Sequence, residues 1–233
     1  MSFYTKLILV QIYIHIMFLF GFFIADWYAI LLSLLINQIL FVGICGTVLF
    51  HRISAHKNKI NQTLENSLVV LSWLGATSSA MAWAGGHRKH HRYSDTNKDP
   101  HSPIILGKFK AYWQWSDNSK DLLKYVPDLL RRKVYVFQHK YYFVVLATIH
   151  IISYLLLPLQ YYWAILIVPG FLMWFNGSLI NIFCHNHTGP VNNTVLGLLV
   201  AGEGWHKNHH DYPASPSFNH KLDWGGKIFL LLK

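Results

Sequence analysis

Two long stretches of the chain contain almost no charged side chains, and they limit its possible folds more than any other feature. Residues 7–50 include one charged residue, Asp26, and residues 141–202 include none. An apolar run of about 20 residues is long enough to cross the hydrocarbon core of a bilayer as a helix. Backbone groups inside a bilayer must bond to one another, so spanning segments of this length are helical. The sequence therefore predicts an all-α integral membrane protein.

These stretches divide into four predicted transmembrane helices, about residues 7–25, 27–50, 141–157 and 161–183. The polar remainder, residues 51–140 and 184–233, is expected to form a helical cap. Within the cap, a helix is predicted around residues 120–137. No linker-like composition divides the chain, so we expect a single domain over residues 1–233.

Histidines recur at one spacing in two separate segments. Three histidines at positions i, i+3 and i+4 would share one side of a helix. The first segment has His87, His90 and His91, and the second has His206, His209 and His210. A basic patch for phosphate or lipid head groups is an alternative, but Arg and Lys would serve that purpose without histidine. Neutral imidazole is the commonest metal ligand in proteins, so the repetition favours a metal site.

A third pair, His51 and His56, directly follows the second predicted span. Residues five apart do not lie on quite the same face of an α-helix. Both could bind one metal only if the helix frays or ends between them. The alternative is a pair of interfacial histidines beside Arg52 and Lys57, whose long side chains would extend to the membrane surface.

Residues 68–84 are apolar but interrupted by Gly, Ser and Thr, which makes them a marginal span. If His51 and His87 belong to one site, the chain between them must cross the membrane an even number of times. We therefore expect this segment to lie in the interface or inside the protein. Lys and Arg are absent from the two short connections between spans and gather on the side of the histidines. The positive-inside rule makes that side, with both termini, cytoplasmic.

The net charge of +10 suits contact with anionic membrane lipids or with an acidic protein partner. We expect no nucleic-acid partner, because the basic residues crowd around histidines beside the predicted spans. Cys45 lies in an apolar run and Cys184 lies next to one. Neither a disulfide framework nor a cysteine metal site is therefore expected.

The end of the fourth predicted span adds another candidate ligand. Asn181 and His185 are four residues apart, which is about one helical turn. The candidate ligands are then nine histidines: His51, His56, His87, His90, His91, His185, His206, His209 and His210. Because one metal ion takes about four to six ligands, nine suit two ions close together.

The three histidine segments read His-Arg-Ile-Ser-Ala-His at residues 51–56, His-Arg-Lys-His-His at residues 87–91 and Glu-Gly-Trp-His-Lys-Asn-His-His at residues 203–210. In this order they resemble the three histidine boxes of the membrane fatty acyl desaturases. Trp83 before the second box and residues 99–103 after it also agree with the family pattern. The match covers nearly the whole chain and is closest to the delta-9, stearoyl-type branch.

The resemblance implies four transmembrane helices under a cytosolic cap that holds a dimetal site. It implies two iron ions and the O2-dependent insertion of a cis double bond, at delta-9, into a long acyl chain. By position it makes all nine histidines iron ligands, Asn181 the holder of a metal-bound water, and Trp83 a neighbour of the kinked acyl tunnel. The floor of that tunnel corresponds to Gly43 and Ile39 of the second span. The alternative is that Gly43, with Gly46, lets another helix approach closely.

The residue types suit this chemistry. Removing hydrogen from an unactivated methylene requires a strong oxidant, which two irons can generate from O2. A dry and narrow cavity protects such an oxidant and selects the carbons that it meets. Asp95, Asp99 and Glu203 are candidates for orienting the imidazole rings, or they are ordinary surface and capping carboxylates.

Gly85 and Gly86 depart from the family pattern, because the animal acyl-CoA enzymes have a basic and an acidic residue there that touch the acyl carrier. The long-chain acyl substrate is therefore a CoA thioester, a carrier-protein thioester or a phospholipid. We expect no fused electron-transfer domain, so a separate electron donor such as cytochrome b5 or ferredoxin would bind the cap. The expected location is a bacterial inner membrane or the endoplasmic reticulum.

Two other functions fit part of the pattern. A di-iron hydroxylase of alkanes or lipids would use the same iron chemistry, although its histidine spacings usually differ. A membrane metal-binding or transport protein would need ligands in mid-membrane, whereas these gather at one face. Three further histidines are expected to be structural: His15 and His150 stand alone within spans, and His101 belongs to a turn.

Overall fold

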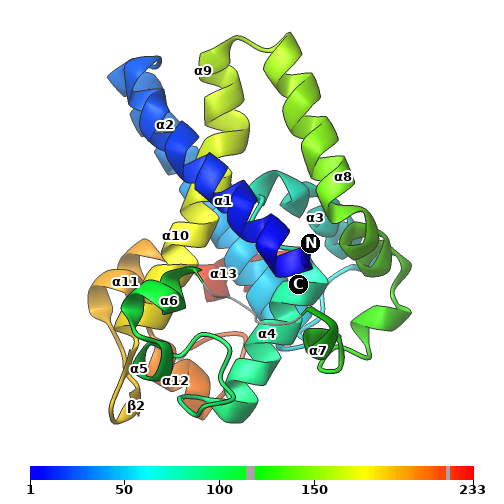
Figure 1. The fold of residues 1–233 in the computed structure, drawn as a ribbon. Helices are drawn as coiled ribbons and strands as arrows, with labels where there is room; N and C mark the ends of the chain where they lie inside the picture. The colour runs from blue at the N-terminus through cyan, green and yellow to red at the C-terminus, as the bar shows by residue number, and fades with distance from the viewer. Residues whose placement is uncertain (114–118, 219–220) are drawn as a thin grey trace.

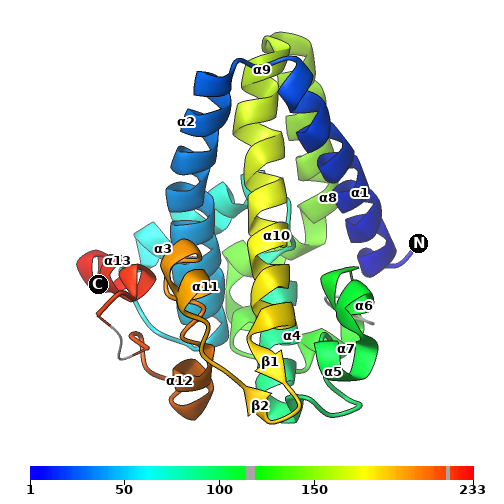
Figure 2. The same cartoon turned by 90° about the vertical axis from the view of Figure 1, so that its left-hand side faces the viewer.

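The computed structural model describes residues 1–113, 119–218 and 221–233, and its regular structure is almost entirely helical (Figure 1). The longest helices stand side by side, and shorter helices gather at one end of them (Figure 2). The helices before residue 100 are α1 Phe3–Phe20, η1 Gly21–Phe23, α2 Trp27–Asn37, η2 Gln38–Ala55, α3 Gln62–Leu71, η3 Ser72–Gly75 and α4 Ala80–Tyr93. Those up to the last long helix are α5 Pro103–Leu106, α6 Lys108–Trp113, α7 Ser119–Leu123, η4 Leu129–Arg131, α8 Lys133–Leu156, α9 Leu159–Tyr162, η5 Trp163–Ile167 and α10 Val168–Phe183. The strands β1 His185–Asn186 and β2 Gly189–Pro190 pair antiparallel, and α11 Thr194–Leu199, α12 His206–Asp211 and α13 Trp224–Leu232 follow.

Four helical segments of the described chain are long and apolar enough to cross a membrane: Phe3–Phe23, Trp27–Ala55, Lys133–Leu156 and Leu159–Phe183. The all-α membrane fold predicted from the sequence is therefore confirmed. The third segment begins at Lys133, about two turns before the start predicted from the sequence. Its first turns carry polar residues, so the apolar run that the sequence shows begins later than the helix does. Gln138 is one of these, and its amide donates to the Val69 carbonyl at 2.8 Å instead of facing lipid.

The second spanning segment changes its hydrogen bonding before it reaches the histidines. Its first part, α2, is an ordinary α-helix that Asp26 caps by accepting from the Ala29 N–H at 2.8 Å. Its second part, η2, is a π-helix, in which each N–H bonds to the carbonyl five residues earlier. His51 and His56 are thus one turn apart, and their ring centroids lie 4.9 Å from each other. The helix need not fray between them.

Residues 62–93 form a bent pair of helices and not a straight span. The segment Gln62–Gly75 and helix α4 meet at 90°, with a break of four residues between them. Ala76 adopts a left-handed conformation in this break, and Ser79 caps α4 by accepting from the Ala82 N–H. As a result His87 of α4 returns to His56, with 3.0 Å between their Nε2 atoms.

The prediction of one continuous helix around residues 120–137 is wrong. The segment is divided into α7, the short turn η4 and the start of α8. Pro127 lies between α7 and η4, where a proline lacks the N–H that a helix interior needs and its ring clashes with the preceding turn. Both chain termini lie toward the end of the molecule where the short helices gather (Figures 1 and 2).

Large aromatic side chains fill the space between the long helices. Trp163, Trp174, Tyr142 and Tyr162 are all fully buried and belong to one apolar cluster. Trp163 also donates through Nε1 to the Phe18 carbonyl, so its polar atom is satisfied inside the apolar layer. This packing fixes the long helices relative to one another and thereby the ends that carry the histidines.

Candidate metal centre

Five histidines from distant parts of the chain converge in one set, called here the five-histidine group: His51, His56, His87, His91 and His209. They come from the end of η2, from α4 and from α12. The Nε2 atom of His91 lies 3.0 Å from that of His87 and 2.8 Å from that of His209. The Nε2 atoms of His51 and His209 are 2.9 Å apart. Five ring nitrogens therefore face a common centre.

Four more histidines form a second set, called here the four-histidine group: His90, His185, His206 and His210. The Nε2 atoms of His185 and His206 lie 3.0 Å apart, and those of His206 and His210 lie 3.1 Å apart. His90 completes the set with its Nε2 at 3.2 Å from that of His210. All nine sequence-predicted histidines are thus brought together, and the structure divides them five and four.

Carboxylates fix the tautomer of three of these rings, and two of them, Asp99 and Glu203, are buried. Nδ1 of His90 lies 2.8 Å from Asp99 Oδ2, and Nδ1 of His185 lies 2.8 Å from Asp95 Oδ2. Nδ1 of His51 lies 2.5 Å from Glu203 Oε2. A carboxylate accepts the proton of Nδ1, so Nε2 carries a lone pair directed at the centre of its group. The three carboxylates considered from the sequence all contact an imidazole.

Lone pairs that converge at about 3 Å repel one another unless a cation lies between them. A metal bound to imidazole at about 2.1 Å would hold two neighbouring nitrogens, at right angles, about 3.0 Å apart. The contacts of 2.8–3.2 Å within the two groups match this separation. The residues present therefore fit two metal ions bound largely by neutral nitrogen.

Burial favours the neutral form of the imidazoles, which metal binding requires. Burial is the largest cause that lowers the pKa of His56 and of His91 to about 3 and that of His210 to about 2. At His56 the guanidinium groups of Arg52 and Arg88 lower the pKa further. Burial raises the pKa of Glu203 to about 7, while the guanidinium of Arg52, 3.0 Å from Oε1, acts in the opposite direction.

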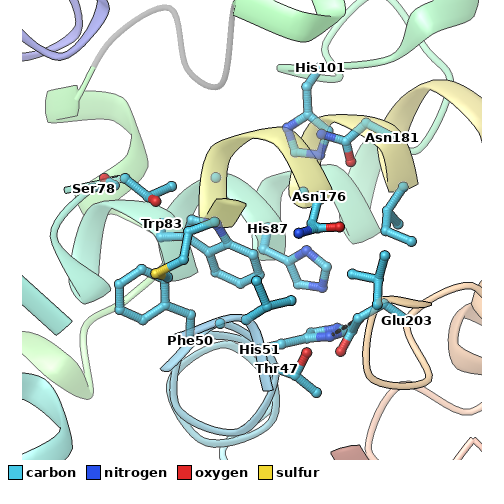
Figure 3. A pocket seen from close by; sticks show the side chains of 18 of the residues that line it. Thr47, Phe50, His51, Ser78, Trp83, His87, His101, Asn176, Asn181 and Glu203 are labelled. Atoms are coloured by element: carbon cyan, nitrogen blue, oxygen red, sulfur yellow. Dashed lines mark ion pairs between the residues drawn. The ribbon is translucent and has the colours of Figure 1, made fainter. Parts of the chain in front are cut away.

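An apolar cavity borders the histidines (Figure 3). Its polar wall includes His51, His87, His101, His206, Asn181 and Glu203, and its apolar wall includes Leu7, Val42, Phe50, Met173, Ile180 and Val200. Trp83 also lines it and stacks on His87, with ring centroids 5.0 Å apart and an interplanar angle of 14°. Asn181 has a buried side-chain nitrogen without a hydrogen-bond partner in the described chain. A water-sized partner at this position would satisfy it.

Comparison with known families agrees with this geometry. The fatty acid desaturase family model matches residues 25–224, which include all three histidine segments. The chain belongs to the fatty acid desaturase family. The resemblance drawn from the sequence is thereby confirmed, and the two histidine groups are the candidate metal site of a family of membrane enzymes.

Several curated desaturases are similar to the chain over most of its length. It is 30% identical to "Acyl-CoA 5-desaturase AL21" of Anemone leveillei, over 91% of the chain and 69% of that protein. It is 28% identical to "Acyl-CoA Delta(11) desaturase" of Choristoneura rosaceana, over 93% of the chain and 73% of that protein. It is 29% identical to "sn-1 stearoyl-lipid 9-desaturase" of Synechocystis sp., over 85% of the chain and 65% of that protein. These relatives differ in double-bond position and in acyl carrier.

In this desaturase-family chain, neither Gly43 nor Ile39 lines the cavity beside the histidines. Ile39 is 53% exposed, and a Cβ at Gly43 would lie 2.8 Å from the ring of Trp224 in α13. Val42 and Gly46 of the same helix line the cavity instead. In a π-helix, residues four to five apart lie on nearly the same face, so Val42 and Gly46 are aligned with His51 toward the cavity.

Three other histidines occupy different settings. His15 has both ring nitrogens engaged, by the Gln11 carbonyl at 2.7 Å and by the Tyr112 hydroxyl at 2.6 Å. His150 bonds through Nδ1 to the Tyr162 hydroxyl at 2.9 Å, outside both groups. His101 lies closer to the site than its turn motif indicates, because it lines the cavity and stacks on His90 at 4.5 Å. The sequence signal for His101 was its place after the second box, two residues past Asp99.

Proposed function

We propose that the chain is an O2-dependent acyl desaturase that inserts a cis double bond, at delta-9, into a long-chain acyl substrate. Two iron ions would occupy the two histidine groups, with all nine histidines as ligands and Asn181 holding a metal-bound water. The observation that carries the proposal is the convergence of nine Nε2 atoms at one end of an apolar cavity. Family membership and relatives named as delta-9 desaturases support it.

When bound, the two irons would supply an oxidant made from O2 that can remove hydrogen from an unactivated methylene. The protein's own part is to hold, orient and protect. Asp95, Asp99 and Glu203 keep the proton on Nδ1 of three imidazoles, so that Nε2 faces the metal. Neutral ligands leave the ions with their full charge, which three nearby carboxylates partly offset.

The cavity walls would select the carbons that react. Trp83 lies flat against His87, so its indole forms a rigid apolar surface next to the five-histidine group. An extended acyl chain that passes this surface would bring only a few methylenes near the metals. Apolar side chains such as Phe50, Met173 and Val42 exclude water from the rest of the cavity. The assignment of Gly43 and Ile39 to the floor of the acyl tunnel remains a prediction.

The packing of the buried residue Gly85, just before the second box, bears on the acyl carrier. A Cβ at Gly85 would lie 2.5 Å from the Leu122 carbonyl oxygen, because α7 packs directly on α4. No side chain fits at this position, so a carrier contact equivalent to that of the animal acyl-CoA enzymes is absent from residue 85. A phospholipid-bound acyl chain, as in the relatives named acyl-lipid desaturases, is compatible with this packing. CoA and carrier-protein thioesters are the alternatives that the experiment below separates.

In this proposal residues 1–233 form a single desaturase domain whose cap faces the cytoplasm of a bacterium or the cytosolic side of the endoplasmic reticulum. Both termini lie toward the cap end of the long helices (Figures 1 and 2). A separate electron donor, such as cytochrome b5 or ferredoxin, would supply two electrons per double bond. With two protons, these electrons and the two hydrogens removed from the chain reduce O2 to two waters.

The test is expression in a host that lacks its own desaturase, followed by mass spectrometry of the fatty acids. The expected result is a new cis monoene with its double bond at carbon 9. Separate analysis of the phospholipid, CoA and carrier-protein pools during a pulse of labelled saturated acid identifies the carrier first labelled in the monoene. The His209→Ala variant, at equal protein level, is the control. A hydroxylated product, or no product with a functional electron donor present, would contradict the proposal.

A further inference from the structure

A fully buried arginine connects the first histidine box to the C-terminal segment. Arg52 lies between His51 and Ile53, and it is 1% exposed. Its Nε donates to the Pro216 carbonyl at 2.8 Å, and Nη2 donates to both carboxylate oxygens of Asp223 at 2.9 and 3.1 Å. Its guanidinium also lies over the ring of Phe218, 4.3 Å from the centroid. One alternative drawn from the sequence has the Arg52 side chain extend to the membrane surface. The structure instead buries it inside the protein.

Asp223 is built into this junction with all its oxygens engaged. It is 1% exposed, and it caps α13 by accepting from the Gly226 N–H at 2.8 Å. It also accepts from the Phe218 N–H at 2.9 Å. Its carboxylate packs so closely on Gly202 that a Cβ there would overlap it, and Gly202 has a φ of 86° that favours glycine. The residue next to Gly202 is Glu203.

Glu203 joins the arginine to the metal ligand. Its Oε1 accepts from Arg52 Nη1 at 3.0 Å, while its Oε2 lies 2.5 Å from Nδ1 of His51. These contacts form a continuous series of hydrogen bonds and ion pairs from Asp223 through Arg52 and Glu203 to His51. One planar guanidinium thus contacts both carboxylates, Asp223 through Nη2 and Glu203 through Nη1, so the position of Glu203 depends on Asp223. The four-histidine group has separate supports, because Asp95 and Asp99 lie in the segment after the second box.

We propose that Asp223 and Arg52 are positioning residues for the five-histidine group, through which the C-terminal segment sets metal affinity at that group alone. The inference rests on the proposed function in so far as it takes the groups to bind metal. Without Asp223, the buried Arg52 would turn toward its remaining partner and pull Glu203 away from His51. The His51 ring would then lose the contact that fixes its tautomer.

The experiment is a Co²⁺ titration of the full chain, purified in detergent and stripped of metal, with absorbance spectra and metal analysis. The wild type should bind two equivalents. Asp223→Asn should weaken one of the two binding steps by about 10–100-fold, the range found when an outer partner of a metal ligand is lost, and leave the other step unchanged. Asp95→Asn should weaken the other step.

The matched control is Asp211→Asn, which removes an aspartate of α12 that pairs with Lys207 at the surface, 2.7 Å away. It should leave both steps unchanged. Arg52→Lys keeps the positive charge but lacks the planar guanidinium that contacts Glu203 and Asp223 at once. It should weaken the same binding step as Asp223→Asn. Glu203→Gln keeps a hydrogen-bond acceptor for His51 and should weaken that step less than Glu203→Ala.

The outcomes separate the inference from the proposed function. A wild type that binds no Co²⁺ contradicts the metal-centre proposal itself. Two unchanged steps in both Asp223→Asn and Arg52→Lys, with a normal wild type, overturn the inference. Equal loss of both steps in variants that keep the thermal midpoint of the metal-free wild type also overturns it. If Asp223→Asn does not fold, the test rests on Arg52→Lys and on the comparison of Glu203→Gln with Glu203→Ala.

Discussion

The Nε2 atoms of His91 and His209 lie 2.8 Å apart although 118 residues separate these histidines in the chain. One ring comes from α4, the second helix of the bent pair, and the other comes from α12 near the C-terminus. Neither helix alone provides more than two ligands to the five-histidine group. The five-histidine group therefore forms only when α4 and the C-terminal segment are both folded against the long helices.

Alanine at any of six histidines should abolish desaturation: His87, His90, His91, His206, His209 or His210. Each ring contributes an Nε2 to one of the two groups, and removing one ligand opens the metal to water. The measurement is the product yield in a desaturase-deficient host at equal protein level. His15→Ala and His150→Ala should keep most activity, because these rings lie outside both groups. Normal yields in several of the six variants would contradict the metal-site assignment.

Cysteine labelling should place Asn61 and Gln160 on opposite sides of the membrane. Asn61 caps α3, five residues after His56, whereas Gln160 lies in the first turn of α9, which follows the C-terminal end of α8. Both residues are exposed, so single cysteines there can react with a membrane-impermeant maleimide. We expect Asn61→Cys to react only from the cytoplasmic side. Equal accessibility from one side would show that the spans are assigned incorrectly.

Chain-length preference should respond to Gly46, which lines the cavity. A Cβ at Gly46 would meet the Phe41 carbonyl oxygen at 3.4 Å and Met173 at 3.9 Å, which are ordinary contact distances, so a larger residue is accommodated and narrows the cavity that Gly46 lines. Gly46→Phe should shift products toward shorter chains, while Co²⁺ binding stays normal. The paired variant Gly43→Phe tests the alternative floor, although its side chain would meet Trp224. A shift in Gly43→Phe alone would favour the position chosen from the sequence.

The metal-free protein should lose stability as the pH falls below about 6.5. The pKa of His56 and that of His91 are about 3 in the folded chain, against 6.5 for an ordinary histidine. Between these values the unfolded chain binds more protons, so acid favours unfolding. The thermal midpoint in detergent should be level from pH 8 to 7 and fall toward pH 5. Bound Co²⁺ should raise the midpoint at pH 7 and be released on acidification. A midpoint that does not change down to pH 5 would be inconsistent with neutral buried imidazoles.

Much of the architecture follows from local sequence. The length of the uncharged runs is enough to predict four spans, because a helix must hide its own backbone in a bilayer. Box spacing and resemblance together predicted the nine histidines. The carboxylates Asp95 and Asp99 were found as candidates because they follow the second box closely. For Arg52 the sequence offers a surface position only as one alternative, and nothing in its neighbourhood points to Asp223, which is 171 residues away.

The division of the histidines was decided by tertiary structure alone. By spacing, His87, His90 and His91 form one set, yet His90 belongs to the four-histidine group and the other two to the five-histidine group. In the same way, α12 gives His209 to one group and His206 and His210 to the other. Residues i and i+4 point almost the same way from a helix, whereas the residue between them points to a neighbouring side. Sequence therefore determined which residues are candidate metal ligands, and the packing of α4 against α12 and η2 determined which of them share a group.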